Sequence, residues 1–324
     1  MQAFEYANPT TVKDAIALLS DDAAVLAGGT DLISMMKEYL ATPKRLVNIK
    51  SIKELGGIAK AGGGLRIGAT ATFDELATST LVRTEYPSLQ QAALGVTSPQ
   101  IRNMGTVGGD LLQRPRCWYF RNGFGILGKD KDGTSLAPIG ENRYHAIFPK
   151  GDAYYVNPSS LAPALIALGA KAKIAGPNGN REVGIDELYV IPGTNSGREL
   201  SLQPNEILTE IVVPAARGTK NATYEVRHKE ALDWPLATAS VALQMKGTSI
   251  AKASIVLGHV GPTPVMAAAA ANALTGKTLS ADLATEAGRL AVEGANPMSG
   301  NTYKLQLVRT AVKRAIMQAG GIKA

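Results

Sequence analysis

Two adjacent glycines in the segment Ala27-Gly28-Gly29-Thr30-Asp31-Leu32 are the residues of this sequence best suited to hold a phosphate. Glycine has no Cβ, so its backbone can take positive φ and can lie directly against a ligand. The segment stands between an apolar run, residues 23–26, and a run of helix formers, residues 32–40. This order predicts a strand, a tight turn and a helix whose first amides suit a diphosphate. Thr30 or Asp31 could cap that helix, and a turn that binds nothing is the alternative.

A second glycine pair lies in Thr106-Val107-Gly108-Gly109-Asp110. No other chemistry is visible from spacing. The sequence has no G-x-G-x-x-G between strand and helix, no G-x-x-x-x-G-K-[ST] and no G-x-S-x-G. His145, His228 and His259 lie far apart without metal-ligand spacing, and Cys117 is the single cysteine. We therefore predict no catalytic residue and no metal site in this chain, and expect a bound cofactor to carry the chemistry.

Composition excludes several other classes of protein. Hydrophobic content of 45% and charged content of 19% are those of a globular protein with ample core. The net charge is +7, but the sequence has no run of basic residues and no basic patch interleaved with aromatic residues. We therefore predict no nucleic-acid partner. No window is long and apolar enough to cross a membrane, and no signal peptide is visible. With a lone cysteine, these features predict a cytoplasmic protein, although export on a partner's signal stays open.

The elements that would position the glycine loops form α/β units. Residues 1–55 are expected to hold a helix from Val12, a strand at 23–27, a helix to about Leu40 and a strand at 46–49. Thr72 and Glu75 form a capping box. Pro158-Ser159-Ser160 is expected to cap an apolar helix over 161–168. Further expected elements are a helix over 88–96 and strands at 65–69, 170–175 and 206–213.

The C-terminal part has a different pattern. Alternating residues predict an antiparallel hairpin of 236–245 and 250–257, and helical periodicity predicts helices over 264–274, 281–293 and 302–319. We predict two domains: residues 1–218, with subdomains of about 1–55 and 56–218, and residues 219–324. Residues 113–157 form an irregular insertion in the first domain.

Taken together, the motifs indicate a family. The first loop, followed by Ile101-Arg102-Asn103-Met104-Gly105-Thr106-Val107-Gly108-Gly109-Asp110, resembles the FAD-binding (medium) subunit of the molybdenum hydroxylases. These enzymes include xanthine dehydrogenases, aldehyde oxidoreductases and carbon monoxide dehydrogenases. Residues 158–165 and 224–245 also look like segments of that family, so the resemblance spans the chain.

The resemblance implies an α+β fold of the molybdenum-hydroxylase and vanillyl-alcohol-oxidase type. Two subdomains would clamp an extended FAD, and a C-terminal domain with a three-stranded antiparallel sheet and helices would follow. The first loop would wrap the pyrophosphate, and the second would continue toward the ribityl chain and flavin. Asp31 is awkward beside phosphates, so we assign it to capping or turn geometry. The residues implied to bind the cofactor are Val25, Leu26, Ala27, Gly28, Gly29, Thr30, Asp31, Leu32, Val96, Thr97, Asn103, Thr106, Gly108, Gly109, Asp110, Ser160, Arg227 and Lys229.

Two positions depart from the family pattern. The insertion resembles one that holds a [4Fe–4S] cluster on four cysteines in one branch of the family, and Cys117 alone is present here. We therefore predict the loop without a cluster. Ser160 stands where the family usually has Asp after Pro-x-Ser, although a serine hydroxyl can still donate and accept a hydrogen bond.

The function implied by the resemblance is electron relay. A large molybdopterin subunit would oxidise the substrate, [2Fe–2S] clusters of a small subunit would pass electrons to FAD in this chain, and the flavin would reduce an external acceptor. The alternatives are a stand-alone FAD oxidase and a structural subunit that has lost its flavin. The sequence specifies neither the substrate nor whether the acceptor is NAD, a quinone, oxygen or a carrier protein.

Overall fold

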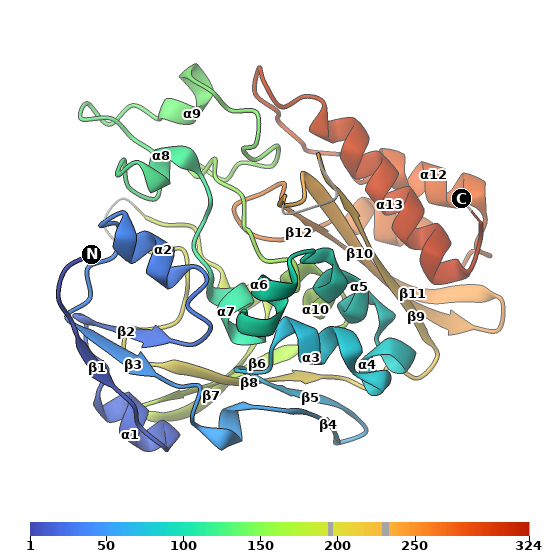
Figure 1. Cartoon of the computed structure of the whole chain (residues 1–324). Coiled ribbons are helices and arrows are strands. Elements are labelled where there is room, and N and C mark those ends of the chain that lie inside the picture. The colour runs from blue at the N-terminus through green and yellow to red at the C-terminus, as the bar shows by residue number, and fades with distance from the viewer. Residues whose placement is uncertain (194–196, 229–232, 324) are drawn as a thin grey trace.

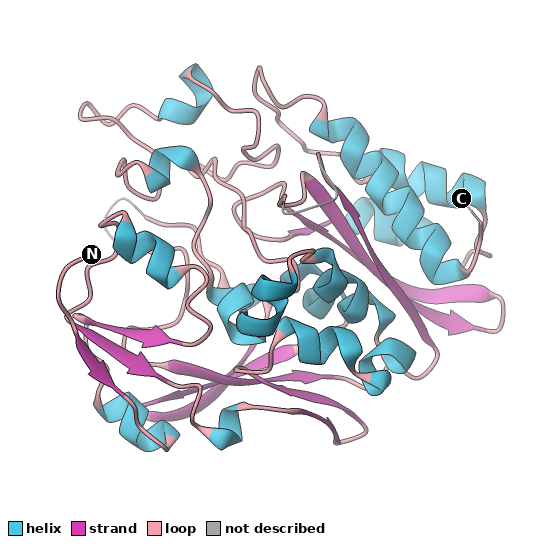
Figure 2. Ribbon diagram, viewed as in Figure 1, coloured by secondary structure: helices cyan, strands magenta, loops and turns pink. Residues whose placement is uncertain are grey.

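The computed structural model of the protein describes residues 1–193, 197–228 and 233–323. In these residues the chain forms three sheets, each with its own helices, along the order of the sequence (Figures 1 and 2). No helix in the described ranges is long and apolar enough to cross a membrane.

The first sheet is small and parallel. Its strand order is β1-β3-β2. Helix α1 connects β1 to β2, and α2 connects β2 to β3. Thr11 caps α1 by accepting a hydrogen bond from the Asp14 amide at 3.1 Å. Its elements are β1 (Glu5–Ala7), α1 (Val12–Ala17), β2 (Ala23–Leu26), α2 (Leu32–Lys37) and β3 (Arg45–Asn48).

The second sheet has five antiparallel strands in the order β4-β5-β8-β6-β7. Its strands are β4 (Ile58–Ala61), β5 (Gly64–Gly68), β6 (Lys171–Gly176), β7 (Gly179–Gly184) and β8 (Ile207–Val213). Its helices are α3 (Phe73–Thr78), α4 (Thr80–Glu85), α5 (Pro87–Gly95), α6 (Pro99–Met104), α7 (Val107–Leu112) and α10 (Ala162–Ala167). The predicted capping box at the start of α3 is confirmed, with Thr72 and Glu75 bonding to each other's backbone amides.

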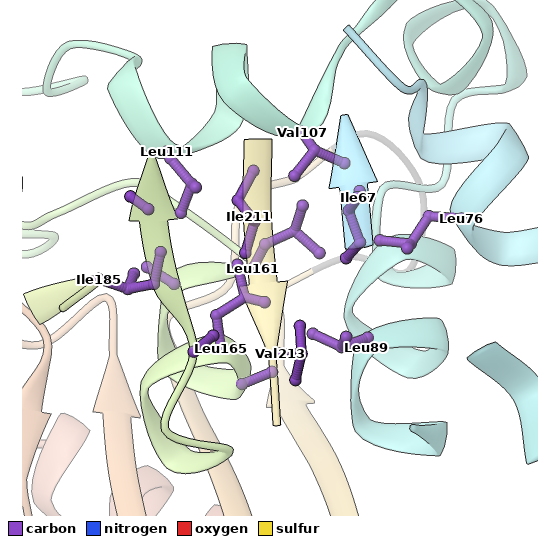
Figure 3. Packing of buried hydrophobic residues seen from close by; sticks show 14 of the residues in the cluster. Ile67, Leu76, Leu89, Val107, Leu111, Leu161, Leu165, Ile185, Ile211 and Val213 are labelled. Carbon is purple, nitrogen blue, oxygen red and sulfur yellow. The ribbon is translucent and has the colours of Figure 1, made fainter. Parts of the chain in front are cut away.

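The core of this second unit holds α7 in place. Figure 3 shows Val107 and Leu111 of α7 pointing toward Ile67 and Ile211 of the sheet. All four side chains are fully buried. The helix that follows the second glycine loop is therefore fixed by the hydrophobic core.

The third sheet is antiparallel, in the order β12-β11-β10-β9 (Figure 1). Helix α13 packs on β9 and β10, α11 packs on β11, and α12 packs against both helices. The predicted hairpin is confirmed, because β10 pairs with β11 along its length. The pairing begins with Thr238 opposite Gly258 and ends with Lys246 opposite Ser249. The elements are β9 (Thr219–Val226), β10 (Ala237–Lys246), β11 (Ser249–Gly258), β12 (Val265–Met266), α11 (Ala268–Leu274), α12 (Ala281–Leu290) and α13 (Lys304–Gly320).

The sheet differs from the expectation in two places. It has four strands instead of three, because the two residues of β12 pair with β11 ahead of α11. Residues 219–226 form β9, where no strand was expected; pairing with β10 decides the strand there.

Residues 113–157 are mostly loop, as expected. They contain only two short helices, α8 (Trp118–Arg121) and α9 (Leu136–Ile139). In Figure 1 this segment lies above α2 and the first sheet. The segment therefore lies beside the first glycine loop, from which it is distant in sequence.

Candidate functional site

The two glycine loops pack directly against each other. The first loop (residues 27–32) leaves β2 and turns into α2, with Gly29 at φ 73°. A Cβ on Gly28 would lie 2.0 Å from the carbonyl oxygen of Met104, just ahead of the second loop (residues 106–110). Only glycine allows the two backbones to approach this closely.

Four backbone amides of the first loop pair with no residue that the structure describes. Within the described ranges, the N–H groups of Gly28, Gly29, Thr30 and Asp31 donate no hydrogen bond. The carbonyls of Gly29 and Asp31 are used, since they accept from Ile33 and Met35 at 3.1 Å each. Four consecutive free donors are costly unless a ligand or water satisfies them, and convergent N–H groups suit an anion.

The amides of the second loop are already used. The N–H of Gly108 donates to the Ala69 carbonyl at 2.8 Å, and that of Gly109 donates to Thr106 Oγ1 at 3.1 Å. The Thr106 hydroxyl thus serves as the N-cap of α7. Because its glycines carry no side chains, this loop lets a ligand lie close to the backbone, but it supplies no hydrogen-bond donors from Gly108 or Gly109.

Both loops line one elongated cleft. Its larger part, about 410 Å³, is bounded by both loops, the start of β8 and the side chains of Arg114 and Arg198. A smaller part of about 150 Å³ continues past Thr106 and Gly109 toward Ser160 and Trp234. The two parts share lining residues, so a single extended ligand can occupy both.

Asp31 does not cap α2, which corrects the expectation from sequence. It occupies the N-cap position, but its side chain makes no capping hydrogen bond. Its carboxylate accepts from the Arg114 amide at 2.9 Å and from Arg121 Nη2 at 2.8 Å, and Arg116 Nη2 lies 3.3 Å away. The charge that seemed awkward beside a phosphate is therefore neutralised, and it anchors the insertion over the first loop.

Asp110 is a buried acceptor at the end of the second loop. It accepts from the Ser159 hydroxyl, from the Leu161 amide at 3.0 Å and from Gln113 Nε2 at 2.9 Å. Burial raises the pKa of Asp110 to about 6, although these hydrogen bonds favour the charged form. Asp110 therefore fixes the Pro-Ser-Ser segment and with it Ser160, which lines the smaller part of the cleft.

Comparison with known proteins agrees with this geometry. Residues 2–216 match the family model described as the FAD binding domain in molybdopterin dehydrogenase. The chain belongs to this family. Residues 222–319 match the CO dehydrogenase flavoprotein C-terminal domain.

Individual relatives cover almost the whole chain. The carbon monoxide dehydrogenase medium chain of Hydrogenophaga pseudoflava is 32% identical over 324 residues, covering 98% of this chain and 96% of its own length. The aldehyde oxidoreductase FAD-binding subunit of Escherichia coli is 30% identical over 333 residues, covering 98% and 99%. A solved structure of carbon monoxide dehydrogenase from Hydrogenophaga pseudoflava superimposes with a TM-score of 0.77 at 31% identity, covering 100% of this chain and 99% of that one. The predicted family, fold class and FAD cofactor are thereby confirmed.

The cleft fits the FAD of the molybdopterin dehydrogenase family. Its larger part is lined by Gly28, Gly29, Thr30 and Asp31, whose amides bond to no described residue and would suit a diphosphate. Its smaller part continues toward Ser160, where the rest of an extended ligand would lie. The residues predicted from sequence that line the cleft come from four segments of the chain. They are Val25, Ala27, Gly28, Gly29, Thr30, Asp31, Leu32, Val96, Thr97, Thr106, Gly108, Gly109, Asp110 and Ser160.

Four residues predicted to bind FAD are not placed on the cleft wall. Leu26 and Asn103 do not line either part of it, and Lys229 lies outside the described residues. Arg227 forms an ion pair with Glu225, and burial raises the pKa of that carboxyl to about 7. A contact of Arg227 with the flavin stays a prediction.

Sequence reasoning missed the charged residues Arg114, Arg198, Glu199, Glu206, Arg116 and Asp233 of the cleft wall. Arg114 makes a bidentate pair with Glu199, through Nε at 2.5 Å and Nη2 at 2.7 Å, and Arg198 lines the same wall. The arginine-rich run 114–121 was a visible signal for anion binding. It was interpreted only as part of an insertion, because nothing in the sequence shows that it folds back over the first loop.

The insertion shows no arrangement typical of a metal centre. Among the described residues, no group of three or more His, Cys, Asp or Glu could hold a metal ion. Cys117 is a free, half-buried thiol whose Sγ lies 3.1 Å from His145 Nε2. His145, His228 and His259, which are distant in sequence, nevertheless line one cavity, separate from the main part of the cleft.

Proposed function

We propose that this chain is the electron-transfer flavoprotein subunit of a molybdopterin-dependent hydroxylase or dehydrogenase. In this proposal, [2Fe–2S] clusters of a small partner subunit deliver electrons that a large molybdopterin subunit has removed from its substrate. FAD, when bound here, supplies the redox centre that takes up these electrons and releases them to an external acceptor. The chain's own residues bind and orient the cofactor.

The single observation that carries the proposal is the set of four free amides on the first loop. Gly28, Gly29, Thr30 and Asp31 present their N–H groups to a cleft that can hold an extended ligand. Family membership identifies that ligand as FAD. The partner subunits are supported by the relatives, two of which are named medium chain and FAD-binding subunit.

The relatives favour a relay over a stand-alone oxidase. They cover almost the whole chain, and their names describe subunits: a medium chain and an FAD-binding subunit. The proposal also places the complex in the cytoplasm, a prediction that rests on the free thiol of Cys117.

The test is an absorption spectrum of the purified chain, with flavin and iron assayed on the same sample. We expect flavin bands corresponding to about one FAD per chain and no iron. Absence of flavin after incubation with FAD, both in the chain and in the complex isolated with its partners, would overturn the relay and favour a structural subunit. Turnover of an alcohol by the yellow chain alone would favour the stand-alone oxidase.

A further inference from the structure

A single cation stands on the described wall of the smaller part of the cleft. Among the described residues that line this part, Arg116 is the one lysine or arginine. Three carboxyl groups line the same part, those of Asp31, Asp110 and Asp233. These groups would repel a negative charge on a ligand unless a nearby positive charge offset them. Arg116 is therefore the residue of this wall that can attract such a charge.

The ion pair of Arg116 neutralises it only in part. Its Nη2 lies 3.3 Å from Asp31 Oδ1, and the same oxygen accepts a hydrogen bond from Arg121 Nη2 at 2.8 Å. One carboxylate thus faces two guanidinium groups, which leaves the cluster with a net positive charge. Burial lowers the pKa of Arg116 while Asp31 raises it, and a guanidinium keeps its proton in a protein.

The side chain of Arg116 is held between two segments that are far apart in the sequence. Asp31 belongs to the first loop, and Trp234 precedes β10, with its ring centroid 4.5 Å from the guanidinium carbon. The Arg116 Nε is buried, whereas the terminal nitrogens stay accessible and form no hydrogen bond with a described residue. A guanidinium that is already held in place needs little reorganisation when a charge develops beside it.

The smaller part is where the flavin ring of a bound FAD would lie. The first loop, whose amides suit the diphosphate, lines the larger part along most of its length. The smaller part leads from the second loop to Ser160 and Trp234. An FAD with its diphosphate on the first loop would therefore extend its flavin end past Thr106 toward Arg116.

We propose that Arg116 stabilises the negative charge that the flavin ring gains on reduction. The inference rests on the proposed function, because it concerns FAD bound in this cleft. Two electrons, delivered by the [2Fe–2S] clusters of the proposed partner, and one proton from water convert the neutral ring to a singly charged anion. The positive charge of Arg116 favours the anion over the neutral ring and so raises the midpoint potential of the flavin.

The test compares midpoint potentials of the full chain loaded with FAD, measured without oxygen against a dye of known potential. Arg116→Gln removes the positive charge. We expect the variant to hold reduced FAD about tenfold less tightly, relative to oxidised FAD, than the wild type does. For a two-electron couple this lowers the midpoint potential by about 30 mV. An unchanged potential in the FAD-loaded variant would overturn the inference.

Arg121→Gln is the matched control for the ion pair. Arg121 bonds to the same carboxylate oxygen, but it lines neither part of the cleft. Its loss should lower stability and leave the midpoint potential unchanged. If Arg121→Gln lowered the potential as much as Arg116→Gln, the effect would come from the fold of the insertion, and the inference would be wrong.

Arg116→Lys separates charge from shape. The lysine keeps the positive charge and removes the planar group that lies over Trp234. We expect a midpoint potential close to that of the wild type. A potential as low as that of Arg116→Gln would show that charge is not the cause.

FAD content separates this inference from the relay. A wild type that binds FAD, with Arg116→Gln at the same potential, would leave the relay standing and refute the role of Arg116. A wild type that never takes up FAD would refute both. The affinity for oxidised FAD should change little in Arg116→Gln, because the neutral ring gains little from the charge. Loss of oxidised FAD from this variant would contradict a preference for the reduced ring.

Discussion

The two glycine loops contain the same Gly-Gly pair but use their backbones in opposite ways. In the first loop the amides from Gly28 to Asp31 bond to none of the described residues, and the loop is bounded by the small parallel sheet. In the second loop the amides of Gly108 and Gly109 are satisfied by Ala69 and Thr106, and α7 is fixed in the core by Val107. A Gly-Gly motif can therefore supply either donors or space, and the neighbouring structure decides which.

The difference assigns separate tasks to the two sides of the cleft. The first loop supplies donors for an anionic ligand, whereas the second forms a rigid wall against which the first can pack. The contact between Gly28 and the Met104 carbonyl joins these tasks, because it sets the distance between donors and wall. Substitutions at the contact should damage both tasks, and substitutions on either side should damage one.

The largest effect is expected from Gly28→Ala. The new Cβ would lie 2.0 Å from the Met104 carbonyl oxygen, a backbone atom that cannot move without shifting the second loop. We expect a loss of about 3 kcal/mol in unfolding free energy and loss of flavin on desalting, measured by urea unfolding and by the flavin-to-protein ratio. Gly193→Ala is the control, because no atom lies within 4 Å of its new Cβ. Retained flavin in Gly28→Ala would show that the loops are not coupled.

The next largest effect is the change of unfolding free energy with pH that Asp110 causes. Burial raises its pKa from 3.8 to about 6, so between these values the folded state holds a proton that the unfolded state has released. Stability from this group should therefore fall as pH rises from about 4 to 6, by up to about 1.4 kcal/mol per pH unit.

The pH effect of Asp110 is measured as a difference. Unfolding free energies of the wild type and of Asp110→Asn are compared between pH 4 and 7, because carboxyls that do not interact with Asp110 contribute equally to both. The charge of Asp110 also raises the pKa of Glu225, and this coupling changes the difference in the same direction. The wild-type value minus the variant value should decrease with pH. A flat difference would mean that Asp110 titrates normally.

Asp31→Ala tests the anchor of the insertion over the first loop. The substitution leaves Arg116 and Arg121 without their carboxylate, in a half-buried setting where a loss of roughly 2 kcal/mol is expected. Residues 113–157 should become more sensitive to limited proteolysis. Asp22→Ala is the control, because its ion pair with Lys44 is exposed to solvent and should contribute little to stability. Unchanged proteolysis would contradict the anchoring role.

The smallest effect is expected from Thr106→Ala, which removes the cap of α7. Loss of this N-cap should cost about 1 kcal/mol, and Thr106→Ser should recover most of it. Because Gly108 and Gly109 offer the cofactor no hydrogen-bond donors, the FAD dissociation constant of the folded variant should differ from that of the wild type by less than about twofold. A large loss of FAD affinity with intact stability would show that the hydroxyl contacts the cofactor directly.

The sequence by itself determined the elements whose signals are local. The Thr72–Glu75 capping box, the hairpin of β10 and β11 and the glycine turn before α2 depend on residues close together along the chain. Local hydrogen bonds and alternation of polar and apolar residues decide such features, so they could be predicted. The glycine pairs also carried the family resemblance, and with it the cofactor.

Only the tertiary structure decided the role of each polar group. Asp31 faces arginines of the insertion instead of capping α2, and the amide of Gly108 is used by Ala69, while that of Gly28 stays free. His145 and His259 line one cavity although they are 114 positions apart in the sequence. Each outcome depends on a partner that is remote in sequence, and the energy of a polar group is set by that partner and by burial, neither of which a local pattern contains.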